Sequence, residues 1–475
     1  MKLSFARHRT VRFAVLAGLL LAGACRRSEP SPTSGGSVLL VVIDTLRADK
    51  LGCYGDDVGR TPRIDALAAR SLLFENASSH APWTLPATAS LLTSRYPRQH
   101  GAGGRVPDFT ALAPGVETVA ERFGAAGAHT ALVANVTFLD EPFGLTRGFQ
   151  HVDVRAWEDN RHLRHAAATT DAALEWLAQE DGAPFFLMVH YFDCHATYDP
   201  PQPFRRRFAA PEDRETDFAF GTREQMVGLR TGAFRPGASL VRRAEALYDG
   251  EVAYTDQEVG RLLDGLDALG LGGTTLVALT ADHGEEFRDH GGLEHGHTLY
   301  AELLHVPLLL RVPGVPAARI VAGVGQVDVA PTLCAWAGVA PGAGFVGTDL
   351  LPLASASAPR DRDVLAHGNF WGAPLTSLRA GEHKLILTPG AAPRLFRWKT
   401  DPREQRDLAG RAPEVVADLQ RELERLEQRL EAGEPPVPVE LSAEALRGLE
   451  ALGYVGGEER KPNREEGEDA GADGR

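Results

Sequence analysis

The chain has 475 residues, of which 43% are hydrophobic and 24% are charged. This length and apolar content support a large core, in one big domain or in one big domain with a small one beside it. The net charge is −14, so nothing in the composition indicates the basic surface that nucleic-acid binding requires. We therefore expect no nucleic-acid partner, and we interpret the acidity as a contribution to solubility.

The first residues are typical of a targeting segment. Basic side chains such as Lys2 and Arg7 precede the apolar run FAVLAGLLLAGA, which is too short to span a bilayer as a permanent helix. The run ends in small residues before Cys25, as in the lipobox of bacterial lipoproteins, although Ala22 stands where leucine is usual. We predict a signal peptide over residues 1–24.

If Cys25 carries a lipid, residues 25–36 are a flexible tether between the membrane and the domain. A signal peptide that is simply cleaved and an anchor that is not cleaved are the alternatives. All three interpretations place the protein outside the cytoplasm. We expect an exported protein of the periplasm or cell envelope, lipid-anchored through Cys25.

Strand-like and helix-like segments alternate through the middle of the chain. Short apolar runs are typical of strands that are buried on both faces of a parallel sheet. Such runs occupy residues 37–44, 129–135, 183–193, 273–282 and 305–313. Helical spacing or helix-start signals lie between them, near 61–71, 116–126, 165–180, 242–270 and 327–338. We predict an α/β catalytic domain over 37–360, with a large, mostly parallel sheet sandwiched by helices.

The pattern changes after residue 360. DVLAHGNF, LTSLRAGEHKLILTP and RLFRWKTDP read as short antiparallel strands, and 413–433 carries apolar residues at helical spacing. That helix is too short for a coiled coil, so we expect it to pack on the domain. The sequence predicts a C-terminal subdomain of a small antiparallel sheet plus a helix over 361–455. Residues 456–475 are almost without apolar side chains and are expected to be a disordered tail.

Acidic and imidazole side chains follow two of the predicted strands. Asp44 ends the first apolar run, and Asp282 and His283 end another. The carboxyl ends of parallel strands open into the crevice where ligands bind, although an aspartate there can also cap a helix. Oxygen ligands with one imidazole suit Ca²⁺, Mn²⁺, Mg²⁺ or Zn²⁺. We predict a divalent metal site without choosing its ion.

Histidines gather in two loops. RDHGGLEHGHTLY carries His290, His295 and His297, and HYFDCHATYDPP adds Asp193 and His195. These loops are either solvated segments that happen to hold histidines or active-site loops that supply donors to an anionic ester. A further histidine, at position 190, lies within an apolar run and is interpreted as a core residue.

Thr84 lies near the start of a predicted helix in PWTLPATASLLTS, because Pro86 suits the first helical turn. A helix N-terminus offers free N–H groups and the positive end of the helix dipole, so it can hold a sulfate or phosphate oxyanion. A hydroxyl there is poised for in-line attack if a metal lowers its pKa. The local alternative is that Thr84 only caps the helix.

Taken in order, these segments resemble the sulfatase family of the alkaline phosphatase superfamily. The motifs that carry the resemblance include VVIDTLRADKLGCYG, TPRIDALA, SLLTSRYPRQHG, VHYFDCHATYDPP, TADHGEE, HGHTLYAELLHVPLL and ALGYVG. The resemblance implies an alkaline phosphatase-like fold and the cleavage of sulfate or phosphate esters. It places the metal ligands at Asp44, Asp282, His283 and Thr84.

The resemblance also assigns catalytic roles. Thr84 occupies the position of the catalytic residue, and His195 and His295 resemble the histidines that contact the ester oxygens or assist the leaving group. Asp193 and His290 are further candidates by the same comparison. The implied substrate is a sulfate or phosphate ester, on a polysaccharide or a lipid head group.

Five positions depart from the family pattern. Family sulfatases need a cysteine or serine that is oxidised to formylglycine, but Thr84 is a secondary alcohol, whose oxidation cannot give an aldehyde. Thr88 replaces the signature arginine, Thr45 the second paired aspartate, and Asn135 the usual lysine. His283 replaces an asparagine common in calcium sulfatases, which favours the phosphodiesterase and phosphotransferase branches of the superfamily.

We therefore expect an exported, metal-dependent hydrolase or transferase of sulfate or phosphate esters, with Thr84 as the nucleophile. Two alternatives stay open. One is a true sulfatase that works without formylglycine. The other is a non-catalytic binder of anionic ligands that keeps the fold but not the chemistry.

Overall fold

The computed structural model describes residues 36–105, 108–155, 164–214, 218–355, 361–368, 370–430, 433, 435–452 and 454. The predicted signal peptide, the lipidation of Cys25, nearly all of the tether and the tail lie outside these residues, so they stay predictions. No helix in the described ranges has the length and apolar character needed to cross a membrane.

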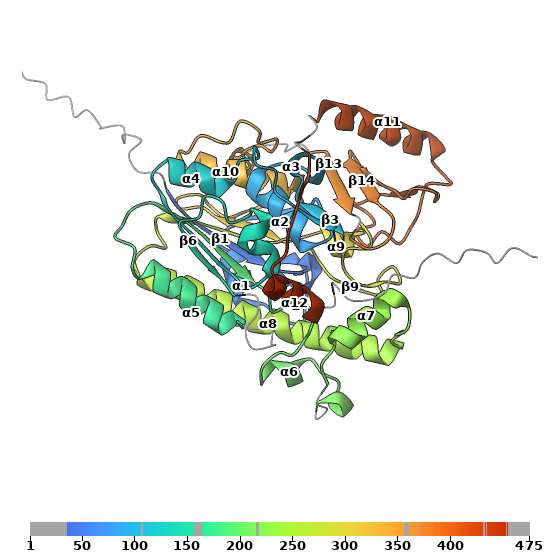
Figure 1. Ribbon diagram of the computed structural model, residues 1–475, viewed down its shortest axis with the longest axis horizontal. Coiled ribbons are helices and arrows are strands. Elements are labelled where there is room, and N and C mark those ends of the chain that lie inside the picture. Colours follow the sequence, from blue (N-terminus) through green and yellow to red (C-terminus); the bar gives the residue numbers. More distant parts are fainter. Residues whose placement is uncertain are drawn as a thin grey trace, which may run out of the picture. The chain divides into compact units, whose positions relative to one another are not determined.

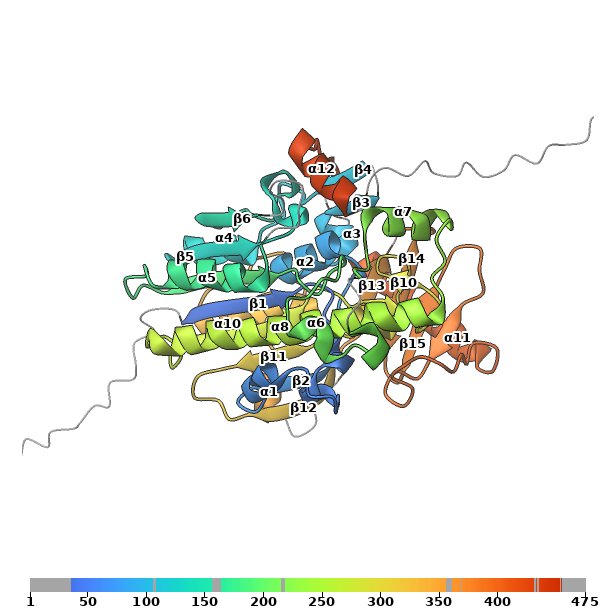
Figure 2. The ribbon, with the colours of Figure 1, turned by 90° about the horizontal axis from the view of Figure 1, so that it is seen from below.

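Eight strands form one central sheet. They are β1 Ser37–Ile43, β2 Leu72–Ser78, β5 His129–Ala134, β6 His151–Val154, β7 Phe185–Tyr191, β8 Thr275–Ala281, β11 Leu308–Arg311 and β12 Ala318–Gly325. Their order is β12-β2-β11-β8-β1-β7-β5-β6, which Figure 2 shows running from β6 to β12. The central strands β1, β7 and β8 are parallel and almost wholly buried, as their continuous apolar sequences predict.

Helices cover both faces of this sheet, so its strands are shielded from water on either side (Figure 1). On one face lie α2 Thr84–Thr93, α4 Val119–Ala125 and α10 Val329–Ala337. On the other lie α1 Pro62–Ala68, α5 Ala166–Leu177 and α8 Ala238–Ala268. The predicted fold class is confirmed.

The C-terminal part contributes a second, four-stranded antiparallel sheet. Its strands are β13 Val364–Gly368, β14 Leu375–Ala380, β15 His383–Leu387 and β16 Arg394–Phe396, in sequential order. Helix α11, Pro413–Arg429, packs on it through Leu419 and Leu423, which join Leu378 and Leu385 in one apolar cluster. The apolar stripe of this helix therefore faces the domain, as predicted.

Shorter elements surround the two sheets. The small helices are α3 Pro97–His100, α6 Phe204–Arg207, α7 Arg223–Thr231, α9 Ala301–Leu304 and α12 Ala443–Ala451. The short strands are β3 Gly103–Arg105, β4 Asp108–Ala111, β9 Glu286–Phe287, β10 Leu293–Glu294 and β17 Val437–Pro438. They matter here because α7 and the chain after α12 bring side chains towards the carboxyl ends of the central strands.

Candidate functional site

The predicted acidic residues meet at one edge of the central sheet. Asp44 follows β1 directly, and Asp282 follows β8. The two strands are parallel neighbours with Ile43 opposite Ala281, so the residues that follow them leave the sheet side by side. The folding of these strands alone therefore brings the two carboxylates together.

Two imidazoles complete the cluster. The Nε2 atom of His283 lies 3.7 Å from Asp44 Oδ1 and 3.5 Å from Asp282 Oδ2. His190, near the end of β7, places its Nε2 atom 3.6 Å from Asp44 Oδ2. All four side chains are fully buried. One ligand atom each from Asp44, His190 and Asp282 lies within 4.8 Å of the other two.

Several atoms of this cluster have no hydrogen-bond partner among the described residues. They are Asp44 Oδ1, Asp282 Oδ2 and both ring nitrogens of His190. Burial and the charge of Asp282 raise the pKa of Asp44 well above its usual value. A buried charge without a partner is costly, and a cation between the ligands removes that cost. Ligands about 2.1 Å from a tetrahedral ion lie about 3.4 Å apart, close to the separations found here. The residues fit a divalent metal ion.

Hydrogen bonds outside the cluster hold the ligands in orientation. The Nδ1 atom of His283 lies 2.9 Å from the carbonyl oxygen of Gly284 and donates to it, which leaves the Nε2 lone pair facing the carboxylates. The backbone N–H groups of Thr45 and His283 both donate to Asp282 Oδ1, at 3.2 and 2.8 Å. The free oxygen of Asp282 is thereby turned towards the site.

The hydroxyl of Thr84 faces this cluster. Helix α2 begins at Thr84 and its N-cap residue is Trp83, so Thr84 lies one position inside the helix and does not cap it. Its Oγ1 atom donates to Asp44 Oδ2 at 3.4 Å and lies 3.3 Å from His283 Nε2. The side chain is 1% exposed. A buried hydroxyl therefore stands beside the ligands at a helix N-terminus, where free N–H groups favour an anion.

His195 and His295 lie together on another side of the site. Their ring centroids are 4.9 Å apart, and His295 lies 4.6 Å from the ring of His283. The Nδ1 atom of His295 is 3.0 Å from Glu285 Oε1, and its Nε2 atom is 3.1 Å from the hydroxyl of Tyr454. Burial lowers the pKa of His295 well below its usual value and raises the pKa of Glu285 to about 7.

Three other residues of the two predicted loops are engaged elsewhere. Asp193 accepts a hydrogen bond of 2.9 Å from the backbone N–H at the start of α5. His290 pairs with Glu302 at 2.7 Å, and His297 pairs with Glu286 at 2.8 Å. These contacts serve local structure, and the metal-ligand cluster does not include the three residues.

Of the other positions that depart from the family pattern, Thr45 and Asn135 have local hydrogen-bond partners. The hydroxyl of Thr45 donates to the carbonyl oxygen of Cys194 at 2.7 Å, so it does not stand in for a carboxylate ligand. Asn135 exchanges hydrogen bonds with Arg164, which include one of 2.8 Å from the guanidinium. Thr88 is buried in α2, and its hydroxyl has no partner among the described residues.

The sequence alone gave no functional role to His190, Glu285 or Tyr454. A signal existed for His190, because an imidazole inside an apolar strand needs a partner to offset its burial. The signal for Glu285 was its position, directly after the Asp282-His283-Gly284 segment that was predicted to hold the metal. Tyr454 belongs to the ALGYVG motif, but no local pattern connects it with histidines so far away in the chain.

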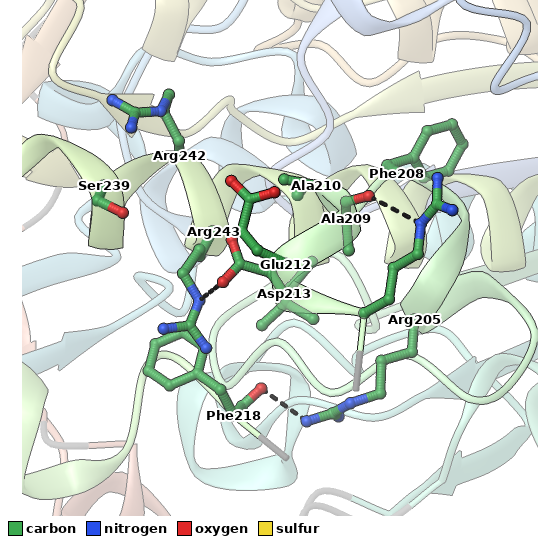
Figure 3. A pocket seen from close by; sticks show the side chains of 13 residues that line it. Arg205, Phe208, Ala209, Ala210, Glu212, Asp213, Phe218, Ser239, Arg242 and Arg243 are labelled. Atoms are coloured by element: carbon green, nitrogen blue, oxygen red, sulfur yellow. Dashed lines mark hydrogen bonds and ion pairs between the residues drawn. The ribbon is translucent and has the colours of Figure 1, made fainter. Parts of the chain in front are cut away.

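A cavity of about 280 Å³ lies elsewhere, at the first turns of α8 (Figure 3). None of its lining residues belongs to the cluster described above. The Nε atom of Arg243 lies 3.0 Å from Asp213 Oδ1, and Arg205 donates to the carbonyl oxygen of Phe218 at 2.6 Å. Its wall carries charges of both signs, two of which pair with each other, and nothing in the described residues assigns this cavity a ligand.

The family model described as Sulfatase matches residues 37–339. Human iduronate 2-sulfatase is 28% identical over 376 residues, which cover 66% of this chain and 67% of that protein. N-acetylglucosamine-6-O-sulfatase of Bacteroides thetaiotaomicron is 23% identical over 505 residues, covering 86% of this chain and 88% of that protein.

A solved structure has the same fold. It is the phosphonate monoester hydrolase of Agrobacterium radiobacter, with a TM-score of 0.68 and 21% identity. The similarity covers 86% of this chain and all of the other chain. The central sheet, its helices and the second sheet are therefore shared architecture.

Replacing one ligand carboxylate should remove the metal. We expect Asp282→Asn to weaken binding of a divalent ion by more than about 100-fold, because the substitution removes a charge that faces the ion directly. Metal content after dialysis, measured by inductively coupled plasma mass spectrometry, checks this. Asp193→Asn is the matched control: it makes the same change beyond the end of β7, the strand on the other side of β1, and it should keep the wild-type metal content. Full metal retention by Asp282→Asn would contradict the assignment.

Proposed function

The chain belongs to the sulfatase family of the alkaline phosphatase superfamily, and from this premise we propose that it cleaves its ester with Thr84 as a metal-activated nucleophile. Membership makes it a hydrolase of sulfuric or phosphoric esters. One observation carries the finer proposal. The buried Thr84 hydroxyl lies 3.4 Å from Asp44 and 3.3 Å from His283. Several buried atoms of this ligand cluster have no hydrogen-bond partner among the described residues.

Asp44, Asp282, His283 and His190 would hold the ion, with the Thr84 oxygen beside them. A divalent ion there supplies Lewis acidity, which lowers the pKa of the hydroxyl and neutralises charge that develops in the transition state. Carboxylate and imidazole ligands are compatible with Ca²⁺, Mn²⁺, Mg²⁺ or Zn²⁺.

The residues of the chain perform the first step as follows. The Thr84 proton passes to Asp44 Oδ2, which already accepts its hydrogen bond. The Oγ1 atom then forms a bond to sulfur or phosphorus as the bond to the leaving oxygen breaks. The N–H groups at the start of α2 bind non-bridging oxygens of the ester. His295 or His195 gives a proton to the departing alcohol. When His295 gives its Nε2 proton, its Nδ1 atom takes a proton from Glu285 across 3.0 Å, so the ring stays neutral.

The second step releases the threonine ester. The Cβ atom of Thr84 carries a single oxygen, so the ester has no neighbouring hydroxyl on the same carbon to expel it. Water must therefore attack sulfur or phosphorus, and the Thr84 oxygen leaves and regains a proton. An acceptor alcohol in place of water would make the same chemistry a transfer reaction.

The names of relatives support a sulfated sugar as substrate. Two relatives are named iduronate 2-sulfatase and N-acetylglucosamine-6-O-sulfatase, and both names denote sulfate esters of sugars. A phosphate ester is the second candidate. Threonine in place of the formylglycine precursor favours it, as does the shared fold of a phosphonate monoester hydrolase. Sulfated polysaccharide and phosphorylated lipid head groups are the corresponding natural classes.

Removal of the Thr84 hydroxyl tests the nucleophile. Thr84→Ala should lower kcat by at least about 10³-fold, because no other hydroxyl of the described residues hydrogen-bonds to the side chains of the ligand cluster. Metal content should stay at the wild-type level. Thr88→Ala makes the same change one turn further along α2, away from the ligands, and should retain activity. Full activity in Thr84→Ala would refute the mechanism.

A product-release panel separates the two substrate classes. The purified protein is given matched 4-nitrophenyl sulfate, phosphate monoester and phosphate diester, each with Mn²⁺, Ca²⁺, Mg²⁺ or Zn²⁺. We expect metal-dependent release of sulfate or phosphate and no turnover after chelation. Preference for sulfate would identify a sulfatase without formylglycine. A protein that binds no metal and cleaves none of the esters would instead be the non-catalytic binder.

We also propose export with a lipid on Cys25, on the strength of the basic start, the apolar run and the small residues before this cysteine. Cells that express the full chain and are fed a radiolabelled or clickable fatty acid should label it and retain it in the membrane fraction. Cys25→Ala should abolish both the label and the retention. Equal labelling of the variant would contradict lipidation at Cys25.

A further inference from the structure

Tyr454 stands inside the site although it comes from the far end of the chain. Its hydroxyl oxygen lies 2.5 Å from His195 Nε2 and 3.1 Å from His295 Nε2. The side chain is 2% exposed. Neither hydrogen bond is local, since the partners lie 259 and 159 residues away in the sequence. A single phenol therefore connects the two histidines proposed to act on the ester.

Packing fixes this phenol in place. The ring centroid of Tyr454 lies 5.2 Å from Phe370 and 5.6 Å from Phe138. The guanidinium of Arg230, on α7, lies 5.2 Å from the same ring. Leu449 of α12 is fully buried and anchors the segment that leads to the tyrosine. Contacts on several sides of the ring thus restrict where the hydroxyl can lie.

The hydrogen bonds can be assigned direction by counting protons. His195 Nδ1 lies 2.5 Å from the carbonyl oxygen of Ala196, which can only accept, so Nδ1 carries a hydrogen. In the neutral ring Nε2 then accepts, and the hydroxyl of Tyr454 is its donor. Since a hydroxyl has one hydrogen, its oxygen must accept from His295 Nε2.

The proton on His295 has a further consequence. With Nε2 carrying a hydrogen, Nδ1 of His295 and Oε1 of Glu285 hold one proton between them across 3.0 Å. The hydroxyl of Tyr198 donates to the other oxygen of Glu285 at 2.7 Å. A continuous chain of hydrogen bonds therefore links Tyr198, Glu285, His295, Tyr454 and His195.

We propose that Tyr454 is a positioning residue of the reaction centre, whose hydroxyl fixes which ring nitrogens of His195 and His295 carry hydrogen. Nε2 of His295 then carries a hydrogen, and not a lone pair, and the oxygen of an anionic ester can share this N–H with the hydroxyl oxygen of Tyr454. An N–H attracts that oxygen and can protonate the leaving alcohol, whereas a lone pair repels it. This inference rests on the proposed ester cleavage, and it adds a role for Tyr454 in that reaction.

Leaving-group dependence distinguishes positioning from general structural support. The test uses a phenyl ester and a 4-nitrophenyl ester of whichever acid, sulfuric or phosphoric, the wild type cleaves. Phenolate is the more basic leaving group, so it needs a proton as it departs, whereas 4-nitrophenolate leaves readily without one. We expect Tyr454→Phe to lower kcat for the phenyl ester at least about tenfold more than for the 4-nitrophenyl ester, with little change in KM. Tyr191→Phe is the control, since it also removes a buried tyrosine hydroxyl, one that bonds to Thr170 at 2.7 Å. It should leave the ratio of the two kcat values, and KM, unchanged.

Two kinetic results would overturn the proposal. Equal losses on both esters, with a lowered Tm, would mean that the phenol only supports the fold. A higher kcat or a lower KM in Tyr454→Phe would mean that the phenol merely blocks the pocket.

A readout without turnover keeps the proposal separate from the proposed function. In protein labelled with ¹⁵N-histidine, the ring nitrogens of His195 and His295 are assigned with His195→Gln and His295→Gln. We expect Nδ1–H on His195 and Nε2–H on His295 in the wild type, and a change of both rings in Tyr454→Phe. If the wild type cleaves no ester, the proposed function fails, but this spectrum still shows whether Tyr454 determines which ring nitrogens carry hydrogen. Unchanged rings in the variant would overturn the role of Tyr454.

Discussion

The repulsion between the buried carboxylates of Asp44 and Asp282 is the constraint on which the site depends. Parallel neighbours in the sheet end together, so the fold gives these side chains no freedom to separate. Even the backbone adapts, because Thr45 adopts φ of +54°, at a cost of about 1 kcal/mol, and its N–H donates to Asp282. Two imidazoles and a hydroxyl surround the carboxylates, but none of them supplies the missing positive charge when neutral. A cation bound between them would supply it.

Much of the central sheet could be predicted, because its inner strands are continuous apolar runs and their order of alternation with helices is plain. The edge strand β12 and its neighbour β2 could not be predicted, since polar residues interrupt β2 and an arginine and two glycines interrupt β12. The antiparallel direction of β11 is set by its neighbours and leaves no mark on its own sequence.

The site divides in the same way. Asp44, Asp282 and His283 directly follow strands, so strand prediction alone places them together. His190 was not predicted, because it lies within an apolar run and only the folded sheet brings its ring to Asp44 at the end of β1. Tyr454 escaped because only tertiary packing connects it to its partners. Local sequence therefore locates site residues at the ends of strands, but it does not reveal a residue that a distant segment brings to the site.

In the proposed mechanism, Thr84 keeps the position of the catalytic residue but changes the route by which the product is released. The hydroxyl stands at the start of α2, beside the ligands, where a formylglycine would attack. Its single oxygen removes the route in which a hydrated aldehyde expels the product from carbon.

The reaction centre joins the two ends of the described chain. Asp44 follows its first strand, and Tyr454 is its last residue. The segment that ends at Tyr454 therefore delivers a phenol to ligands that other parts of the chain hold. With Tyr454 in the role proposed for it, loss of this segment would leave the ligands and the nucleophile in place without the group that positions the two histidines.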